Sequence, residues 1–134
     1  ELAAAIAKFE TNCNSCVNSF VQRAGIAALQ GPMDETRKMV ASFQERRDVI
    51  VEGLNSIAGF DCLLPKGAFF VFPRIVETGY DCRELAQKCL EEAGVACLAG
   101  TAFGKYGEGH LRFSYANSVE NIEKALDRIG EMMS

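Results

Sequence analysis

The sequence lacks any long apolar segment and any concentration of basic residues. No window approaches the roughly 18 uninterrupted apolar residues that a membrane-spanning helix needs, so we expect no membrane contact. The first segment, Glu1 to Lys8, also lacks the basic head and long apolar run of a signal peptide. The formal net charge is −4, and Lys and Arg form no run. Nothing in the sequence therefore indicates a nucleic-acid partner.

Histidine is scarce and the cysteine pairs are incomplete, which limits metal and thiol chemistry. The chain has one histidine, His110, and six cysteines. Cys13-x-x-Cys16 resembles half of a zinc site, but no second close pair of Cys or His supplies the other ligands. His110 has no nucleophilic partner that the sequence identifies. A metal-bound interaction domain and a Cys/His nucleophile stay minor alternatives.

The cysteines of the second half fit a reduced protein. Cys82, Cys89 and Cys97 fall at apolar positions of regular segments, where a free thiol acts as a small hydrophobic side chain. With 134 residues, of which 49% are hydrophobic, the chain can build a core without disulfides. We therefore expect free thiols in a cytoplasmic setting.

The first 30 residues predict helix interrupted once. Alanines and recurring apolar residues fill residues 1–30, and the polar segment from Thr11 to Ser15 predicts a break. Asn14 or Ser15 can cap the second piece, because both side chains accept a hydrogen bond from a helix N-terminus. Gly31-Pro32 ends it.

Residues 32–58 predict one long helix. Pro32 suits the first helical position, and Asp34 and Glu35 suit the positive end of the helix dipole. Apolar residues keep to one stripe, and Gly59 can end the helix in a left-handed conformation. A helix of this length often joins two domains.

Short apolar runs after residue 59 predict strands. They are Phe60–Leu64, Ala68–Phe72, Val95–Leu98 and Leu111–Ala116. The second run has five consecutive apolar residues with three aromatics, so we expect a core strand that is covered on both faces. The last run alternates apolar and polar residues, as a strand with one buried face does.

Two further helices complete the pattern. Asp81 to Ala93 begins with the capping-box spacing of Asp81 and Glu84, and its inward residues are Leu85, Cys89 and Leu90. Asn117 or Ser118 caps a last amphipathic helix. The elements together predict an α+β fold, in which helices pack on a small mixed sheet and a long helix precedes it.

Arg112 is the strongest candidate for binding chemistry. It occupies the polar side of the Leu111–Ala116 strand, and a guanidinium removed from water needs an anion. Arg can hold a carboxylate through two parallel hydrogen bonds. From these residues alone, an ordinary ion pair, for instance with an acid of the last helix, is the simpler interpretation.

The glycine-rich segment Gly100–Gly109 does not match a phosphate-binding loop. Gly104-Lys105 is followed by Tyr106 where Walker A needs Ser or Thr, and Arg112 stands where a dinucleotide fingerprint needs its third glycine. We expect a flexible loop that leads into the Arg112 strand.

Three motifs in order resemble the class I/II aminotransferases. KGAFFVFP (Lys66–Pro73) resembles the aromatic strand of that family, and GVACLAGTAFG (Gly94–Gly104) resembles its glycine-rich turn. GEGHLRFSYA (Gly107–Ala116) is similar to the strand that carries the family's carboxylate-binding arginine. The helix that includes Ala24–Leu29 and the last helix continue the resemblance, which covers essentially the whole chain.

The resemblance implies a pyridoxal-phosphate-dependent enzyme of fold type I. Residues 1–30 would end its large domain, and residues 31–134 would form its C-terminal small domain. Arg112 would bind the α-carboxylate of an amino acid or 2-oxo acid substrate, so that the amino group can be transferred. The full-length enzyme would contain pyridoxal 5'-phosphate and form a homodimer.

The chain departs from the family in what it lacks. The segment with the Schiff-base lysine is absent, so no catalytic residue is assigned, and we expect this chain alone to be inactive with no covalently bound cofactor. Ala99 stands where the family has Pro, and Cys16-Val17 replaces Asn-Pro. The missing Met at residue 1 also suggests a partial or processed chain. The main alternative is a non-catalytic α+β module that binds a small molecule or regulates.

Overall fold

The computed structural model describes residues 1–134 and divides into two compact units, residues 1–37 and 38–134. It has five α-helices, five short strands and two 3-10 turns, so the expected α+β mixture is confirmed. None of the helices combines the length with the apolar character that crossing a bilayer requires.

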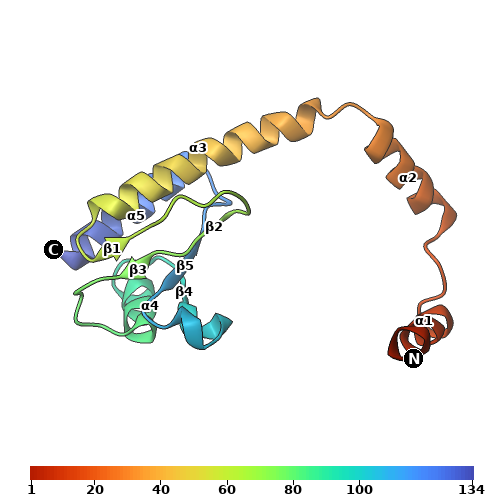
Figure 1. Ribbon diagram of the computed structural model, residues 1–134. Helices are drawn as coiled ribbons and strands as arrows, with labels where there is room; N and C mark the ends of the chain where they lie inside the picture. The colour runs from red at the N-terminus through yellow and green to blue at the C-terminus, as the bar shows by residue number, and fades with distance from the viewer. The chain divides into compact units, whose positions relative to one another are not determined.

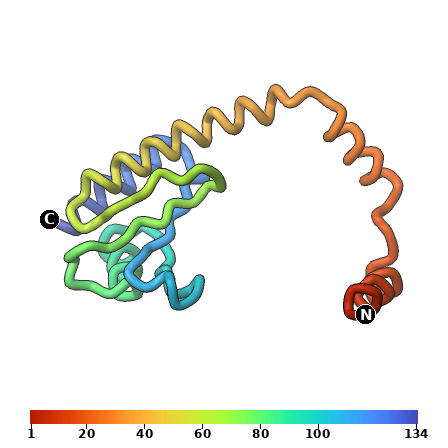
Figure 2. Tube along the Cα trace, in the orientation of Figure 1, coloured from red at the N-terminus to blue at the C-terminus, as the bar shows by residue number.

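The first unit consists mainly of α1 (Leu2–Cys13) and α2 (Ser19–Gln30), which appear as two separate coils in the red and orange part of Figure 2. The expected break at Thr11–Ser15 is placed too early, because α1 continues through Cys13 and α2 begins only at Ser19. The cap of α2 is Asn18, whose side chain accepts from the Val21 N–H at 3.3 Å. The prediction of Asn14 or Ser15 as this cap is therefore wrong.

Neither helix of the first unit buries a residue. Leu2, Ile6 and Phe9 form an i, i+4, i+7 stripe on α1, and each is more than half exposed. Phe20 of α2 is 72% exposed. Tertiary packing supplies most of the stability of a protein helix, and these two helices lack it within the unit.

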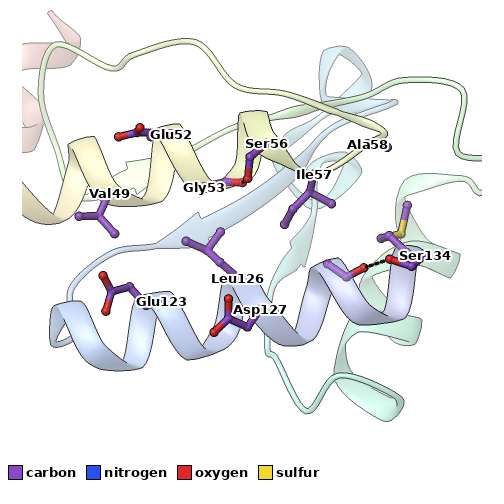
Figure 3. Close-up of a pocket in the computed structure, with 12 residues that line it drawn as sticks. Val49, Glu52, Gly53, Ser56, Ile57, Ala58, Glu123, Leu126, Asp127 and Ser134 are labelled. Atoms are coloured by element: carbon purple, nitrogen blue, oxygen red, sulfur yellow. Dashed lines mark hydrogen bonds between the residues drawn. The ribbon is translucent and has the colours of Figure 1, made fainter.

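The second unit is built on two helices that run in the same direction, α3 (Asp34–Ser56) and α5 (Val119–Met133) (Figure 3). The acidic first turn of α3 and the Ser118 cap of α5, which accepts from the Asn121 N–H at 3.3 Å, are confirmed. The helices approach closely at Gly53, where an added Cβ would lie 2.3 Å from Cδ1 of Leu126. A groove beside this contact is lined by Glu52, Glu123 and Asp127 and by no basic side chain, so it does not suit an anionic ligand (Figure 3).

Five two- to four-residue strands form the sheets (Figure 1), and every pairing is antiparallel, so the expected mixed arrangement of strands is wrong. In the larger sheet, β5 (Leu111–Ser114) lies between β2 (Phe70–Val71) and β4 (Leu98–Ala99). A separate pair joins β1 (Phe60–Asp61) to β3 (Arg74–Ile75). The expected strand at Val95–Leu98 is displaced toward the C-terminus, to Leu98–Ala99. Strand β3 was not expected, because Pro73 predicts the end of the preceding strand.

One apolar core holds the second unit together. Leu54 of α3, Leu85 of α4 (Cys82–Glu91) and Leu111 of β5 are fully buried, and Ile129 of α5 is 1% exposed. The capping box that opens α4 is confirmed, since the Asp81 carboxylate accepts from two N–H groups at 2.7 and 2.9 Å. These hydrogen bonds also lower the pKa of Asp81. Leu90 is 52% exposed, so its expected inward position is wrong.

The lack of burial in the first unit generates a prediction about stability. In the 134-residue chain on its own, amides of α1 and α2 are expected to exchange with solvent nearly as fast as those of an unfolded peptide. Isolated helices shorter than about 12–15 residues are marginal in water. Hydrogen exchange followed by mass spectrometry measures this, with α5 as the protected control. Slow exchange across Ala24–Leu29 would contradict it.

Candidate functional site

The central strand β5 separates the core from the candidate site. Leu111, Phe113 and Tyr115 are at most 5% exposed, whereas Arg112 is half-buried and Ser114 exposed. The predicted alternation is therefore confirmed. The Tyr115 hydroxyl donates to the Ala68 carbonyl at 2.9 Å, which ties the start of the aromatic segment to the end of β5. Three anchored residues thus fix the side of the sheet from which Arg112 projects.

Within the second unit, the Arg112 side of the sheet is left largely open. Arg112 pairs with Leu98 in the β4–β5 register, and Leu98 is 46% exposed. Phe70 pairs with Ser114, which places it diagonal to Arg112 on the same face. The expectation of an aromatic core strand covered on both faces is wrong, because Phe69 and Phe72 stay 44% and 40% exposed, although Phe43 lies beside Phe69 and His110 stacks on Phe72.

The guanidinium of Arg112 has aromatic neighbours and no acidic partner. Its Cζ lies 4.3 Å from the centre of the Phe70 ring and 4.2 Å from that of Phe103. The ion pairs in the second unit join other residues, such as Arg74 with Asp61 at 3.1 Å. The alternative of an internal ion pair between Arg112 and an acid of the last helix is absent from the structure. The hydrogen-bonding edges of this cation are therefore not occupied by a carboxylate of the chain.

The glycine-rich segment is a folded corner, contrary to the expected flexible loop. It forms two 3-10 turns, η1 (Gly100–Phe103) and η2 (Lys105–Gly107). Gly100 and Gly107 are both buried, and their backbones approach so closely that a Cβ on Gly107 would lie 1.9 Å from the Gly100 carbonyl oxygen. The Gly100 N–H donates to the His110 carbonyl at 2.8 Å. This contact sets where Phe103 emerges toward Arg112.

The start of α4 braces the same corner. The buried Cys82 sulfur lies 3.8 Å from the Thr101 hydroxyl and 3.7 Å from the Glu108 carboxylate. Arg83 Nε donates to the Thr101 hydroxyl at 3.3 Å. The helix and the loop therefore hold each other, and Cys82 fills a structural position, as its apolar spacing predicts.

The lysines of this chain do not fit the role of a covalent cofactor ligand. Five of the six side chains are exposed, and such a group needs a buried setting that favours the neutral amine. The half-buried Lys88 donates to Glu92 at 2.6 Å, and this hydrogen bond raises the pKa of the Lys88 ammonium. Lys88 is thus engaged by Glu92 at the C-terminal end of α4.

The thiol and metal alternatives receive no support from the geometry. His110 Nδ1 lies 2.9 Å from the Glu108 carbonyl oxygen, its ring stacks on Phe72, and no hydrogen bond joins it to a cysteine. Burial raises the pKa of the Cys62 thiol to about 11, and a hydrogen bond with Cys89 raises that of Cys97. All six cysteines are free, and no group of three or more His, Cys, Asp or Glu side chains could hold a metal ion.

Comparison with known proteins decides the family. Residues 1–129 match the family model described as aminotransferase class I and II. The chain belongs to the class I and II aminotransferases. The resemblance read from the three sequence motifs is thereby confirmed, as is the aminotransferase-like fold class.

Individual aminotransferases show how much of such a protein this chain represents. It is 39% identical to an aspartate aminotransferase of Rhizobium meliloti (strain 1021) and to an LL-diaminopimelate aminotransferase of Moorella thermoacetica, in each case over 96% of the chain and 33% of the relative. The crystal structure of an aromatic aminotransferase from Pyrococcus horikoshii OT3 matches with a TM-score of 0.87 and 36% identity, over 92% of the chain and 34% of that structure. The chain spans about a third of the length of the relatives it matches.

Sequence reasoning identified Arg112 but missed the rings beside it. Phe70 was assigned to the core, and Phe103 was treated only as part of a glycine-rich segment. The position of Phe70 follows from the β2–β5 register, which pairs it with Ser114. The position of Phe103 depends on the close approach of Gly100 and Gly107, for which the sequence offers only the presence of two glycines.

This close approach generates a prediction about stability. Gly107→Ala is expected to destabilise the chain by about 1–3 kcal/mol or more, because the new methyl group meets backbone that cannot rotate away. Urea unfolding measures the change. Gly67→Ala is the matched control, since an added Cβ there meets nothing within 4 Å. Equal unfolding midpoints for the two variants would contradict the prediction.

Proposed function

We propose that Arg112 binds the α-carboxylate of an amino acid or 2-oxo acid in an intact aminotransferase of which this chain is the C-terminal part. One observation carries the proposal: a half-buried guanidinium lies on an open sheet face with no carboxylate of the chain beside it. Partial removal of a cation from water is unfavourable unless an anion compensates it. A substrate carboxylate supplies that anion.

Arg112 suits this task through its geometry. A guanidinium holds a carboxylate by two parallel N–H···O hydrogen bonds, which fix both the position and the rotation of the bound group. The α-carbon next to the carboxylate is thereby oriented for amino transfer. The acid-lined groove between α3 and α5 offers no comparable anion site.

The proposal extends to the organisation of the whole protein. Residues 1–30 would be the end of the large domain, and residues 31–134 the small domain. The exposed apolar stripe on α1 supports a partner for the first of these segments. The intact enzyme would be a cytoplasmic homodimer that uses pyridoxal 5'-phosphate to exchange an amino group between an amino acid and a 2-oxo acid.

We further propose that residues 1–134 alone do not catalyse amino transfer. Five of the six lysines are exposed and Lys88 pairs with Glu92, which supports the proposal that none of them binds the cofactor covalently. The cofactor would be held by the part of the enzyme outside these residues. In this division of roles, the chain supplies a substrate-binding cation.

The first test replaces Arg112 in the full-length enzyme. Arg112→Lys keeps the charge but loses the two-pronged donor, and kcat/KM is expected to fall roughly 30- to 5,000-fold, equivalent to about 2–5 kcal/mol. Arg128→Lys, at an exposed position of α5, is the matched control and should be neutral. Wild-type kcat/KM for Arg112→Lys would reject the assignment.

The second test uses the 134-residue chain itself. Supplied with pyridoxal 5'-phosphate, an amino acid and a 2-oxo acid, it is expected to give no more amino transfer than the cofactor alone. Calorimetric titration with the amino acid should show no binding tighter than about 1 mM. Saturable binding without turnover would favour the alternative of a non-catalytic binding module. Turnover that Arg112→Lys abolishes would contradict the proposed inactivity.

A further inference from the structure

The side chain of Arg112 is enclosed by two aromatic rings from different parts of the chain. Both rings lie well inside the separation of about 6 Å at which a cation and a ring attract each other. Phe70 comes from β2 and Phe103 from η1. Phe70 has Phe69 as its ring neighbour and Phe103 has Phe72, so the two rings reach the guanidinium from separate segments of the chain.

Each ring has its own support. Phe70 packs on Phe69 with 4.2 Å between ring centres. Phe103 meets the edge of Phe72 at 6.3 Å, and Phe72 stacks on the His110 imidazole at 5.1 Å and 13°. The rings are therefore members of two separate aromatic clusters, and neither depends on Arg112 for its place.

Contacts of this kind decide which parts of a guanidinium stay available. The N–H donors of a guanidinium point outward in its plane, while rings attract its flat faces. A ring that lies over a flat face leaves the donor edges open. They also restrict the rotations of a long side chain before any ligand arrives, which reduces the entropy lost on binding.

We propose that Phe70 and Phe103 are positioning residues that hold the Arg112 guanidinium ready for a substrate carboxylate. The proposal rests on the proposed function of Arg112 and deepens it. The rings touch the arginine and act through it. Their contribution to substrate binding therefore exists only while Arg112 is present, and this dependence separates positioning from a general effect on the fold.

The test is a double-mutant cycle in the full-length enzyme. Phe103→Leu is expected to raise KM for the amino acid about three- to thirty-fold, the range that a partly desolvated cation–ring contact represents, with a smaller change in kcat. In an Arg112→Gln background, the same substitution should change KM no further. Phe103→Tyr keeps the ring face and should restore KM to near the wild-type value.

One control variant and one second test variant accompany the cycle. Tyr106→Leu removes an 87% exposed ring from the next turn, where Lys105 Nζ lies 5.0 Å from its centre, and should leave KM unchanged. Phe70→Leu probes the opposite contact and keeps the test informative if Phe103→Leu does not fold. It should raise KM to a similar degree and should likewise have no effect once Arg112 is replaced.

The outcomes distinguish the two levels of the proposal. If Arg112→Gln leaves KM unchanged, the proposed function of Arg112 fails, and the positioning role fails with it. If Arg112→Gln raises KM but Phe103→Leu and Phe70→Leu have no effect, the positioning role alone is overturned. The same holds if each Phe substitution raises KM equally with and without Arg112, because that result indicates a structural role.

Discussion

A guanidinium partly withdrawn from water, with rings against it and no anion, is the feature on which the candidate site depends. Attraction between a cation and an aromatic ring compensates only part of the lost hydration. A carboxylate that enters from outside can offset the part of the lost hydration that the rings do not compensate. The unfavourable part of the Arg112 environment is thus what makes the position suited to binding.

The fold of residues 38–134 fixes the position of this cation. One face of β5 is anchored in the core by Leu111, Phe113 and Tyr115, and its other face projects Arg112. The loop of η1 and η2 returns to the same face and brings Phe103 with it. In the proposed function, the chain contributes recognition of the substrate carboxylate, and the covalent chemistry falls to residues outside this chain. Such a separation lets a binding group and a reactive group be supplied by different parts of one enzyme.

How much the sequence could predict depends on the range of the interactions involved. The capping box of α4, the Ser118 cap and the alternation along β5 follow from hydrogen bonds and side-chain directions within a few residues, and they were predicted correctly. The resemblance to aminotransferases came from three motifs that follow one another along the sequence. Arg112 could be selected because a strand with one apolar face makes an isolated cation conspicuous.

The errors share a different cause. Phe69 and Phe72 were assigned to a fully covered strand because five apolar residues in succession usually are buried, yet both side chains remain partly exposed. The α2 cap lies at Asn18, later than expected, because α1 extends through Cys13 before the chain breaks. Phe103 was overlooked because its position depends on a backbone contact between residues seven apart, which no periodic pattern reveals.

The contact between Gly100 and Gly107 also governs how this loop can diverge. Side chains at Ala102, Lys105 and Tyr106 point into solvent and can be exchanged without altering the path of the backbone. Residues 100 and 107 admit no side chain at all, since each would occupy space already filled by the other's main chain. Related enzymes and randomised libraries can therefore diversify the outer surface of the turn while the direction of Phe103 is inherited unchanged.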